Sequence, residues 1–202
     1  MSNETVFRLC FTVVFIGNTV ISMYHHNRAV KLTGEIVKRP DEGKAIFLFR
    51  SLFSFPLIIA ALLYMIYPRA MAWAAMPLPD AVRWLGVGLG FVSMWLVYWT
   101  FAALGAQATP TVMTKASHQL VTSGPYRWIR HPIYTSVSIY FISLSLIAAS
   151  WFLLLDSLLG IAIMITVLTK REEEMLIKKF GDTYVQYMSR TGRYLPRPGS
   201  LL

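Results

Sequence analysis

Two groups of polar residues flank the last long apolar stretch of the chain. The first, "SHQLVTSGPYRWIRHPIY" (117–134), leads into that stretch, and the second, "KREEE" (170–174), follows it. The first group has imidazole and guanidinium donors, which suit a carboxylate or a phosphate, and aromatic rings, which suit a flat base or a compact cation. The second has carboxylates, which suit an ammonium group or ribose hydroxyls. Together they predict a site for a small molecule that carries all of these groups.

S-adenosylmethionine is a ligand of that kind, because it combines an adenine, a ribose, a sulfonium and a zwitterionic amino acid. NADPH matches less well, because its phosphates would leave Glu172, Glu173 and Glu174 without a role. A simpler interpretation stays open at this point, since basic residues at a helix start and a charged face beyond a span also occur where only lipid headgroups and water are contacted. The spacing of the histidines and the single cysteine predict no metal site.

Membrane helices must position these residues. Of the 202 residues, 55% are hydrophobic and 14% are charged, a composition typical of an integral membrane protein. The run from Ile133 to Thr169 would form a single helix of roughly 55 Å, too long for a bilayer core of about 30 Å. It must therefore fold back near Ala149, Ser150 and Trp151. This antiparallel hairpin returns the glutamates to the level of the histidines.

The predicted fold is a single all-α membrane domain over residues 1–202 with about five transmembrane helices. The expected spans are 5–24, 45–67, 82–104, 133–149 and 152–169. The first three helices occupy 1–104. The cofactor-binding half, 105–202, contains the last two spans as a helical hairpin, followed by a cytoplasmic helical tail. In that tail, Gly181 is expected to end one helix and Asp182 to cap the next.

The positive charges predict the orientation. Most of the 19 lysine and arginine residues lie in loops 25–44 and 105–132 and in the tail from 170, which by the positive-inside rule face the cytoplasm. The site is therefore expected on the cytoplasmic face of the inner membrane in a bacterium, or of the endoplasmic reticulum in a eukaryote. This distribution accounts for the net charge of +9, so nucleic acid is not an expected partner. The lone Cys10 excludes a disulfide within the chain.

The two polar groups also resemble a known family. "HQLVTSGPYRWIRHPIY" and, after the hairpin, "REEEMLIKKFGDTYVQYMSRTGRYLP" are similar to the isoprenylcysteine carboxyl methyltransferases and, more distantly, to the phospholipid N-methyltransferases. The resemblance covers about residues 105–198, and its two motifs are specific as a pair. It implies an integral membrane methyltransferase that binds S-adenosylmethionine on the cytoplasmic side and acts on a lipid-like or isoprenoid-linked acceptor.

Matched position by position, the resemblance implies ten cofactor-binding residues and two for catalysis. The cofactor-binding residues are His118, Gln119, Leu120, Val121, Tyr126, His131, Pro132, Ile133, Tyr134 and Glu172. Arg130 and Glu173 are the candidate catalytic residues: Arg130 would support the cofactor-binding residues, and Glu173 or Glu174 could take a proton from an amine acceptor. Family members that methylate prenylated cysteine tend to have an arginine one turn before the first glutamate. That position is Leu168 here, which leaves the acceptor open between a carboxylate and an amine.

Two other functions stay open from the sequence. Membrane reductases of the sterol-reductase type have a related C-terminal architecture, and that interpretation predicts binding of NADPH. The basic cytoplasmic loops would also suit a non-catalytic protein that binds anionic membrane lipids. The sequence does not specify the oligomeric state.

Overall fold

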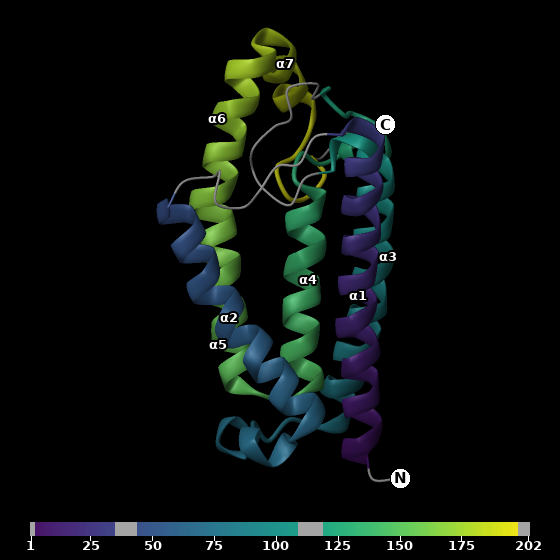
Figure 1. The fold of residues 1–202 in the computed structure, drawn as a ribbon, viewed down its shortest axis with the longest axis vertical. Helices are drawn as coiled ribbons and strands as arrows, with labels where there is room; N and C mark the ends of the chain where they lie inside the picture. The colour runs from purple at the N-terminus through teal and green to yellow at the C-terminus, as the bar shows by residue number, and fades with distance from the viewer. Residues whose placement is uncertain (1–2, 35–43, 109–118, 198–202) are drawn as a thin grey trace.

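The computed structural model describes residues 3–34, 44–108 and 119–197. In this part of the chain, five apolar helices form a bundle: α1 (Asn3–Thr33), α2 (Lys44–Ile66), α3 (Asp80–Leu104), α4 (Pro132–Ile147) and α5 (Trp151–Ile163). α5 continues through a π-helical turn, η5 (Met164–Leu168), into α6 (Thr169–Phe180), and α7 (Asp182–Arg190) folds over the end of the bundle (Figure 1). Three short 3-10 helices lie in the connections: η2 (Pro68–Ala74), η3 (Gly105–Gln107) and η4 (Gly124–Arg127).

Three helical stretches of the described residues are long and apolar enough to cross a membrane: Asn3–Thr33, Asp80–Gln107 and Trp151–Phe180. Shorter apolar stretches occur in the described part of α2, Ser51–Ile66, and in α4, Pro132–Ile147. The predicted all-α integral membrane fold is therefore confirmed. An apolar helix occurs at each of the five predicted spans, and three helical stretches meet the length and hydropathy of a full crossing among the described residues, so the number of complete crossings stays a prediction.

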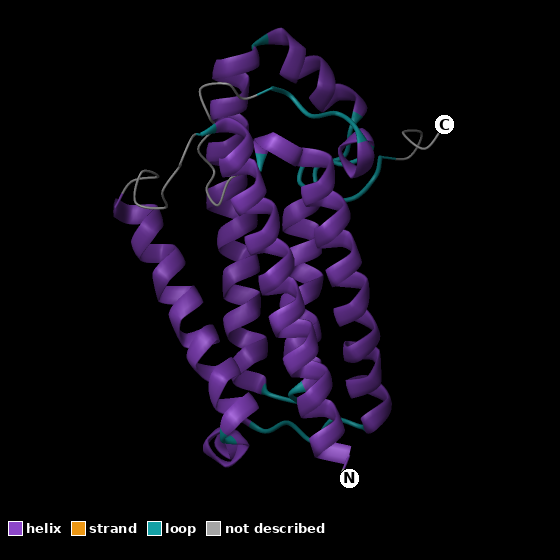
Figure 2. Cartoon of the chain, turned by 45° about the vertical axis from the view of Figure 1, so that its right-hand side comes forward, coloured by secondary structure: helices purple, strands orange, loops and turns teal. Residues whose placement is uncertain are grey.

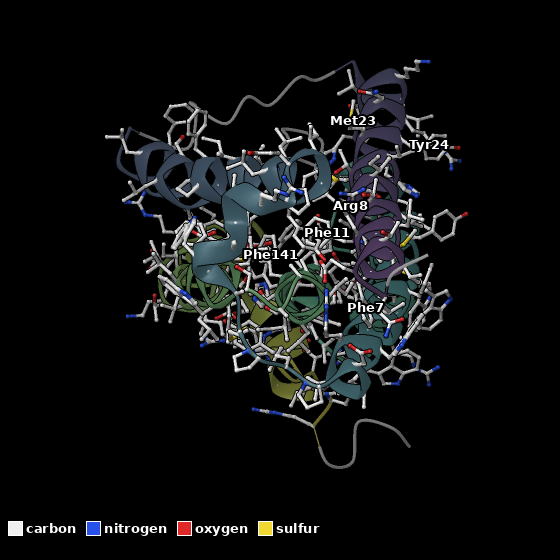
Figure 3. The ribbon with its side chains drawn as sticks, turned by 90° about the horizontal axis from the view of Figure 1, so that it is seen from below. Phe7, Arg8, Phe11, Met23, Tyr24 and Phe141 are labelled. Atoms are coloured by element: carbon white, nitrogen blue, oxygen red, sulfur yellow. The ribbon has the colours of Figure 1, made fainter. Side chains whose placement is uncertain are left out.

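The core lies where α1 packs against the other helices. Phe7 and Phe11 of α1 are buried there. Seen along the bundle, Phe11 points from α1 toward the interior, whereas Tyr24 points outward (Figure 3). α1 and α3 approach closely because Gly90 has no side chain, and a Cβ there would lie 2.7 Å from Val14 Cγ2. α2 instead diverges from α1 toward its own N-terminal end (Figure 2).

The turn between α4 and α5 lies where the sequence predicts it. α4 ends at Ile147 and α5 begins at Trp151. Ala149 takes a positive φ of 46°, and its carbonyl accepts a hydrogen bond from Met76 N at 2.7 Å. Ser150 caps the N-terminus of α5, because its hydroxyl accepts a hydrogen bond from Leu153 N at 3.4 Å. The hairpin is therefore fixed by its own cap and by the segment after η2.

A buried arginine joins four helices at the same end of the bundle. Arg83 of α3 donates from Nε and Nη2 to the carbonyl of Ile147 on α4, at 3.0 and 2.9 Å. Its Nη1 donates to Glu4 Oε2 of α1 at 2.8 Å, and its Nη2 also donates to Tyr64 Oη of α2 at 3.2 Å. The guanidinium carbon lies 4.0 Å from the centroid of the Phe7 ring. We call these five residues the Arg83 cluster.

The junction of α6 and α7 agrees with one prediction and corrects another. Gly181 ends α6 as predicted, with a φ of 54° in the left-handed region that glycine tolerates. The prediction for Asp182 is wrong: it is the first residue of α7, and no side chain caps that helix. The reason is that Gly181 alone ends α6 and starts α7. Asp182 therefore falls inside the first turn, where its charge interacts favourably with the helix dipole.

Candidate active site

The α4–α5 hairpin brings the two polar groups of the sequence together. His131 occupies the N-terminal cap position of α4, and α5 with its continuation α6 runs antiparallel to α4 (Figure 1). Glu172 consequently returns to the level of His131, and His131 Nδ1 lies 3.5 Å from Glu172 Oε2. The prediction that the hairpin places the histidine and the glutamates at one end of the molecule is confirmed.

Glu173 is a hydrogen-bond acceptor shared by three basic side chains. It is only 4% exposed. Its Oε1 lies 3.1 Å from Arg130 Nε, 3.2 Å from His131 Nε2 and 3.3 Å from Arg193 Nε. Arg193 Nη2 also donates to the second carboxylate oxygen. We call these four residues the Glu173 cluster. A buried charge is tolerated only when it is paired, and this carboxylate is paired on both of its oxygens.

The π-helical turn η5 decides which glutamate faces inward. A π-turn holds one more residue than an α-turn, so it rotates the following helix by about 100° relative to an uninterrupted α-helix. Within it, Thr169 Oγ1 donates to the carbonyl of Met164, five residues earlier, at 2.8 Å. Beyond this turn Glu173 is buried, Glu172 is half-buried and Glu174 is exposed.

The segment after α7 runs beside the start of α4. Arg130 N donates to the carbonyl of Gly192 at 2.8 Å. His131 N donates to the carbonyl of Arg193 at 3.0 Å. Glycine is required at position 192, because a Cβ there would lie 1.7 Å from the carbonyl oxygen of Leu195. These backbone bonds place the Arg193 side chain in the Glu173 cluster.

His131 is 3% exposed and lies at the centre of this arrangement. Its ring stacks on Tyr134, with centroids 5.4 Å apart and planes 5° apart. Burial disfavours the charged imidazole, but the hydrogen bonds to Glu172 and Glu173 outweigh burial, so the pKa of His131 is raised above its ordinary value. The protonated ring donates from both nitrogens, and each nitrogen faces a carboxylate.

Tyr126 lies in η4, between α3 and α7. Tyr187 of α7 donates its hydroxyl to the Tyr126 carbonyl at 2.7 Å. Burial, followed by the nearby charge of Glu172, raises the pKa of the Tyr126 hydroxyl well above its ordinary value, so the group stays a neutral donor. η4 is held against α3 because Gly124, with a φ of 59°, leaves room for Ala103: a Cβ on Gly124 would lie 2.8 Å from Ala103 Cβ.

The predicted residues that precede η4 reach the same end of the bundle. Gln119 N donates to Gln107 Oε1 at 3.2 Å. Leu120 packs against the buried side chains of α6 and α7, and Val121 is half-buried. His118 lies outside the described residues. We call residues 119–131 together with α6, α7 and residues 191–197 the cap.

Pro132 and Ile133, in the first turn of α4, lie where the cap meets the bundle. Pro132 is buried, and its carbonyl accepts from Ser136 Oγ at 2.7 Å. Ile133 packs against a cluster that includes Ala29 of α1 and Phe101 of α3. The side chain of Ile133 therefore has partners in the bundle, outside the cap.

Two residues that position the site were not among the predicted site residues. Arg193 pairs with Glu173, as described above. Tyr194 Oη donates to Thr169 Oγ1 at 2.8 Å, and the Tyr194 carbonyl accepts from Thr135 Oγ1 at 2.8 Å, so Tyr194 ties the tail to both α4 and α6. The sequence feature that could have indicated these two residues is the short polar stretch "TGRY" (191–194), which directly follows α7 and belongs to the second motif.

Comparison with known proteins agrees with this geometry. The family model described as "Phospholipid methyltransferase" matches residues 81–183, just over half of the chain. A 94-residue segment is 27% identical to the uncharacterized protein YpbQ of Bacillus subtilis, covering 46% of this chain and 56% of YpbQ. An 86-residue segment is 34% identical to human protein-S-isoprenylcysteine O-methyltransferase, covering 40% of this chain and 28% of the human protein. The matches thus span about half and about a quarter of the lengths of these relatives.

A solved structure resembles nearly the whole chain. It is the eukaryotic intramembrane Ras methyltransferase, isoprenylcysteine carboxyl methyltransferase, with a TM-score of 0.56 and 19% sequence identity. The similarity covers 93% of this chain and 67% of that one, which shows a shared fold. The resemblance that the two sequence motifs indicate is confirmed, and this chain belongs to the phospholipid methyltransferase family of membrane proteins, with the fold of isoprenylcysteine carboxyl methyltransferase.

Proposed function

We propose that this protein is an integral membrane methyltransferase that uses S-adenosylmethionine to methylate a lipid-like or isoprenoid-linked acceptor. The observation that carries this proposal is the contact of His131 with Glu172, at 3.5 Å, inside the segment that matches the family model. The two motif halves are 41 residues apart in the sequence, and a shared ligand site accounts for both lying at one place. The basic residues of the cap support a location on the cytoplasmic face.

The residues of the cap fit the chemistry of this cofactor. Glu172 has a side chain that is 30% exposed and, among the described residues, one ion-pair partner, so its carboxylate can still accept from an ammonium group or ribose hydroxyls. Tyr126 and Tyr134 supply aromatic faces close to it. The remaining residues that would hold the cofactor are His118, Gln119, Leu120, Val121, His131, Pro132 and Ile133.

When bound, the cofactor supplies a methyl group on a sulfonium, which needs no covalent nucleophile from the protein. The task of the side chains is to hold both partners in line and to exclude water, which can contribute several kcal/mol to lowering a barrier. Arg130 and Glu173 suit this task as positioning residues. Arg130 donates to Glu173 and, through Nη1, to the carbonyls of Met188 and Thr191 at 3.1 and 2.5 Å. Glu173 in turn has three basic partners, so a proton from an amine acceptor would more readily go to the exposed Glu174 or to water.

The surroundings of Leu168 support an apolar acceptor. Leu168 is 3% exposed and packs with Tyr134, Ile163, Met164 and Met175. An apolar wall directly below the cofactor-binding residues suits the hydrocarbon part of a substrate that enters from the bilayer. The nearby Lys170 and Arg171 are exposed, so they lie away from this wall.

The proposal is tested by calorimetric titration of the purified protein in detergent with S-adenosylhomocysteine, the demethylated product, and with NADPH. We expect S-adenosylhomocysteine to bind, and Glu172→Gln to weaken its binding roughly 10-fold or more, because the variant loses the negative charge and one of the two acceptor oxygens. Glu174→Gln, one position along on the exposed face, is the matched control and should bind as the wild type does. Binding of NADPH alone would replace the proposal with a reductase, and binding of neither would leave an anionic-lipid-binding protein.

The acceptor is identified by a second experiment. Membranes that contain the protein are supplied with methyl-labelled S-adenosylmethionine, and lipids are extracted and separated. We expect label in an amine- or carboxylate-bearing lipid fraction that depends on Glu172. Base-labile label would indicate a methyl ester, and base-stable label would indicate an N-methyl group.

A further inference from the structure

Tyr184, in the first turns of α7, has a buried hydroxyl without a hydrogen-bond partner in the described part of the chain. The residue is 1% exposed and is among the largest fully buried side chains. Buried hydroxyls in folded proteins nearly always have a partner, so an unpaired one needs an explanation. An interaction with a bound ligand is one such explanation.

The surroundings of Tyr184 include residues of the proposed cofactor site. Its ring packs in a buried cluster with Leu176 of α6 and Leu120, one of the predicted cofactor-binding residues. Its hydroxyl is close enough to Glu173 and Glu172 to feel their charges. Burial, followed by these carboxylates, raises the pKa of Tyr184, so its hydroxyl stays a neutral donor at physiological pH.

Tyr187, one helical turn further along α7, provides the contrast. It is also nearly fully buried, at 4% exposed, and its ring centroid lies 5.8 Å from that of Tyr184. The hydroxyl of Tyr187 donates to the Tyr126 carbonyl at 2.7 Å. The spacing of the two tyrosines places both on one face of α7, which favours a packing role for their rings. Packing explains the two rings, and the hydrogen bond explains the Tyr187 hydroxyl, but a phenylalanine would pack equally well at position 184.

We propose that Tyr184 is a cofactor-binding residue whose hydroxyl donates a hydrogen bond to the ribose or the amino acid carboxylate of S-adenosylmethionine. This inference rests on the proposed function. Both acceptor groups are also present in S-adenosylhomocysteine, so binding of that compound reports the interaction without any catalytic turnover. The Glu172 carboxylate, whose charge acts on the Tyr184 hydroxyl, then accepts from the cofactor while Tyr184 donates to it, and the two residues recognise groups of opposite hydrogen-bonding character.

The test compares Tyr184→Phe with Tyr187→Phe, since each removes a single oxygen from α7. Thermal unfolding in detergent without ligand and calorimetric titration with S-adenosylhomocysteine are measured for both. We expect Tyr184→Phe to unfold at the same or a higher temperature than the wild type, because it removes an unpaired buried polar group, and to bind the ligand roughly 5- to 20-fold more weakly. Tyr187→Phe should lower the unfolding temperature of the ligand-free protein.

Two results would overturn the role of Tyr184 alone. One is a wild-type protein that binds S-adenosylhomocysteine and a Tyr184→Phe variant that binds it with equal affinity. The other is a lower unfolding temperature for ligand-free Tyr184→Phe, which would mean that the hydroxyl already has a protein partner. A wild-type protein that binds no S-adenosylhomocysteine removes the proposed function and this inference together. Titration with 5′-methylthioadenosine, which keeps the ribose but lacks the amino acid, separates the two acceptors: a loss of affinity in Tyr184→Phe places the bond on the ribose.

Discussion

The two ends of the helix bundle each contain a buried pairing of arginine with glutamate, but they use it differently. In the Arg83 cluster, all three guanidinium nitrogens have protein partners, on Glu4, Tyr64 and the Ile147 carbonyl. These partners belong to three other helices. In the Glu173 cluster, the shared group is the carboxylate, and its partners come from the start of α4 and from the tail after α7.

The two ends differ in how many of their buried hydrogen-bonding groups lack protein partners. The Arg83 cluster satisfies its own arginine and joins α1, α2, α3 and α4, as a structural clamp requires. Beside the Glu173 cluster, the half-buried Glu172 has one ion-pair partner and the buried Tyr184 hydroxyl has none among the described residues. Free hydrogen-bonding capacity inside a packed cap is costly for a purely structural element, so the comparison favours a ligand site at this end.

Removing Glu173 should have the largest effect. Glu173→Ala leaves Arg130, His131 and Arg193 without their common acceptor, and breaking a buried ion pair from one side typically costs about 3 to 5 kcal/mol. We expect the affinity for S-adenosylhomocysteine to fall more than roughly 100-fold, with a lower unfolding temperature. Calorimetry and thermal unfolding in detergent measure both. Glu174→Ala is the control on the exposed face, and retention of wild-type binding by Glu173→Ala would contradict an organising role for the cluster.

Removing Arg83 should separate stability from binding. Arg83→Met leaves the Ile147 carbonyl and the Tyr64 hydroxyl with fewer partners, which is expected to lower the free energy of unfolding by about 2 to 3 kcal/mol. The folded fraction should still bind S-adenosylhomocysteine with an affinity within about 2-fold of the wild type, because the cap is at the other end. Unfolding by sodium dodecyl sulfate and calorimetry test this. Arg69→Met, at an exposed position, should change neither quantity, whereas a large loss of affinity in Arg83→Met would show that the two ends are coupled.

The pH dependence should be the smallest of these effects and specific to the cap. The folded-state pKa of His131 is raised above its ordinary value of about 6.5, so its ion pairs stabilise the fold fully below that pH. This stabilisation is lost as the pH rises through the folded-state pKa. We therefore expect the unfolding temperature of the wild type to fall over that window, measured at constant ionic strength. His131→Gln should remove this component of the slope, and an unchanged slope in the variant would assign the titration to another group.

Much of the fold follows from local features of the sequence. The apolar runs located each apolar helix of the bundle, because a helix must be apolar along its length to be stable in lipid. The length of the run from 133 to 169 required a reversal, and that reversal implied that the glutamates return to the level of His131. The sequence predicts Asp182 as the N-terminal capping residue of α7, whereas Gly181 occupies that position. A single glycine both ends α6 and precedes α7, so no separate capping residue follows it.

The sequence by itself determined the membrane class, the hairpin and the two polar groups that meet at its open end. It could not determine which of the three consecutive glutamates is buried, because the π-helical turn at Met164–Leu168 shifts the helical phase of everything after it. Nor could it show that Arg193 joins the Glu173 cluster, or that the Tyr184 hydroxyl has no hydrogen-bond partner among the described residues. Those outcomes depend on the tail folding back along residues 130 and 131 through backbone hydrogen bonds. Local pattern encodes burial and length, whereas contacts between segments far apart in the chain are decided only when the tertiary structure brings them together.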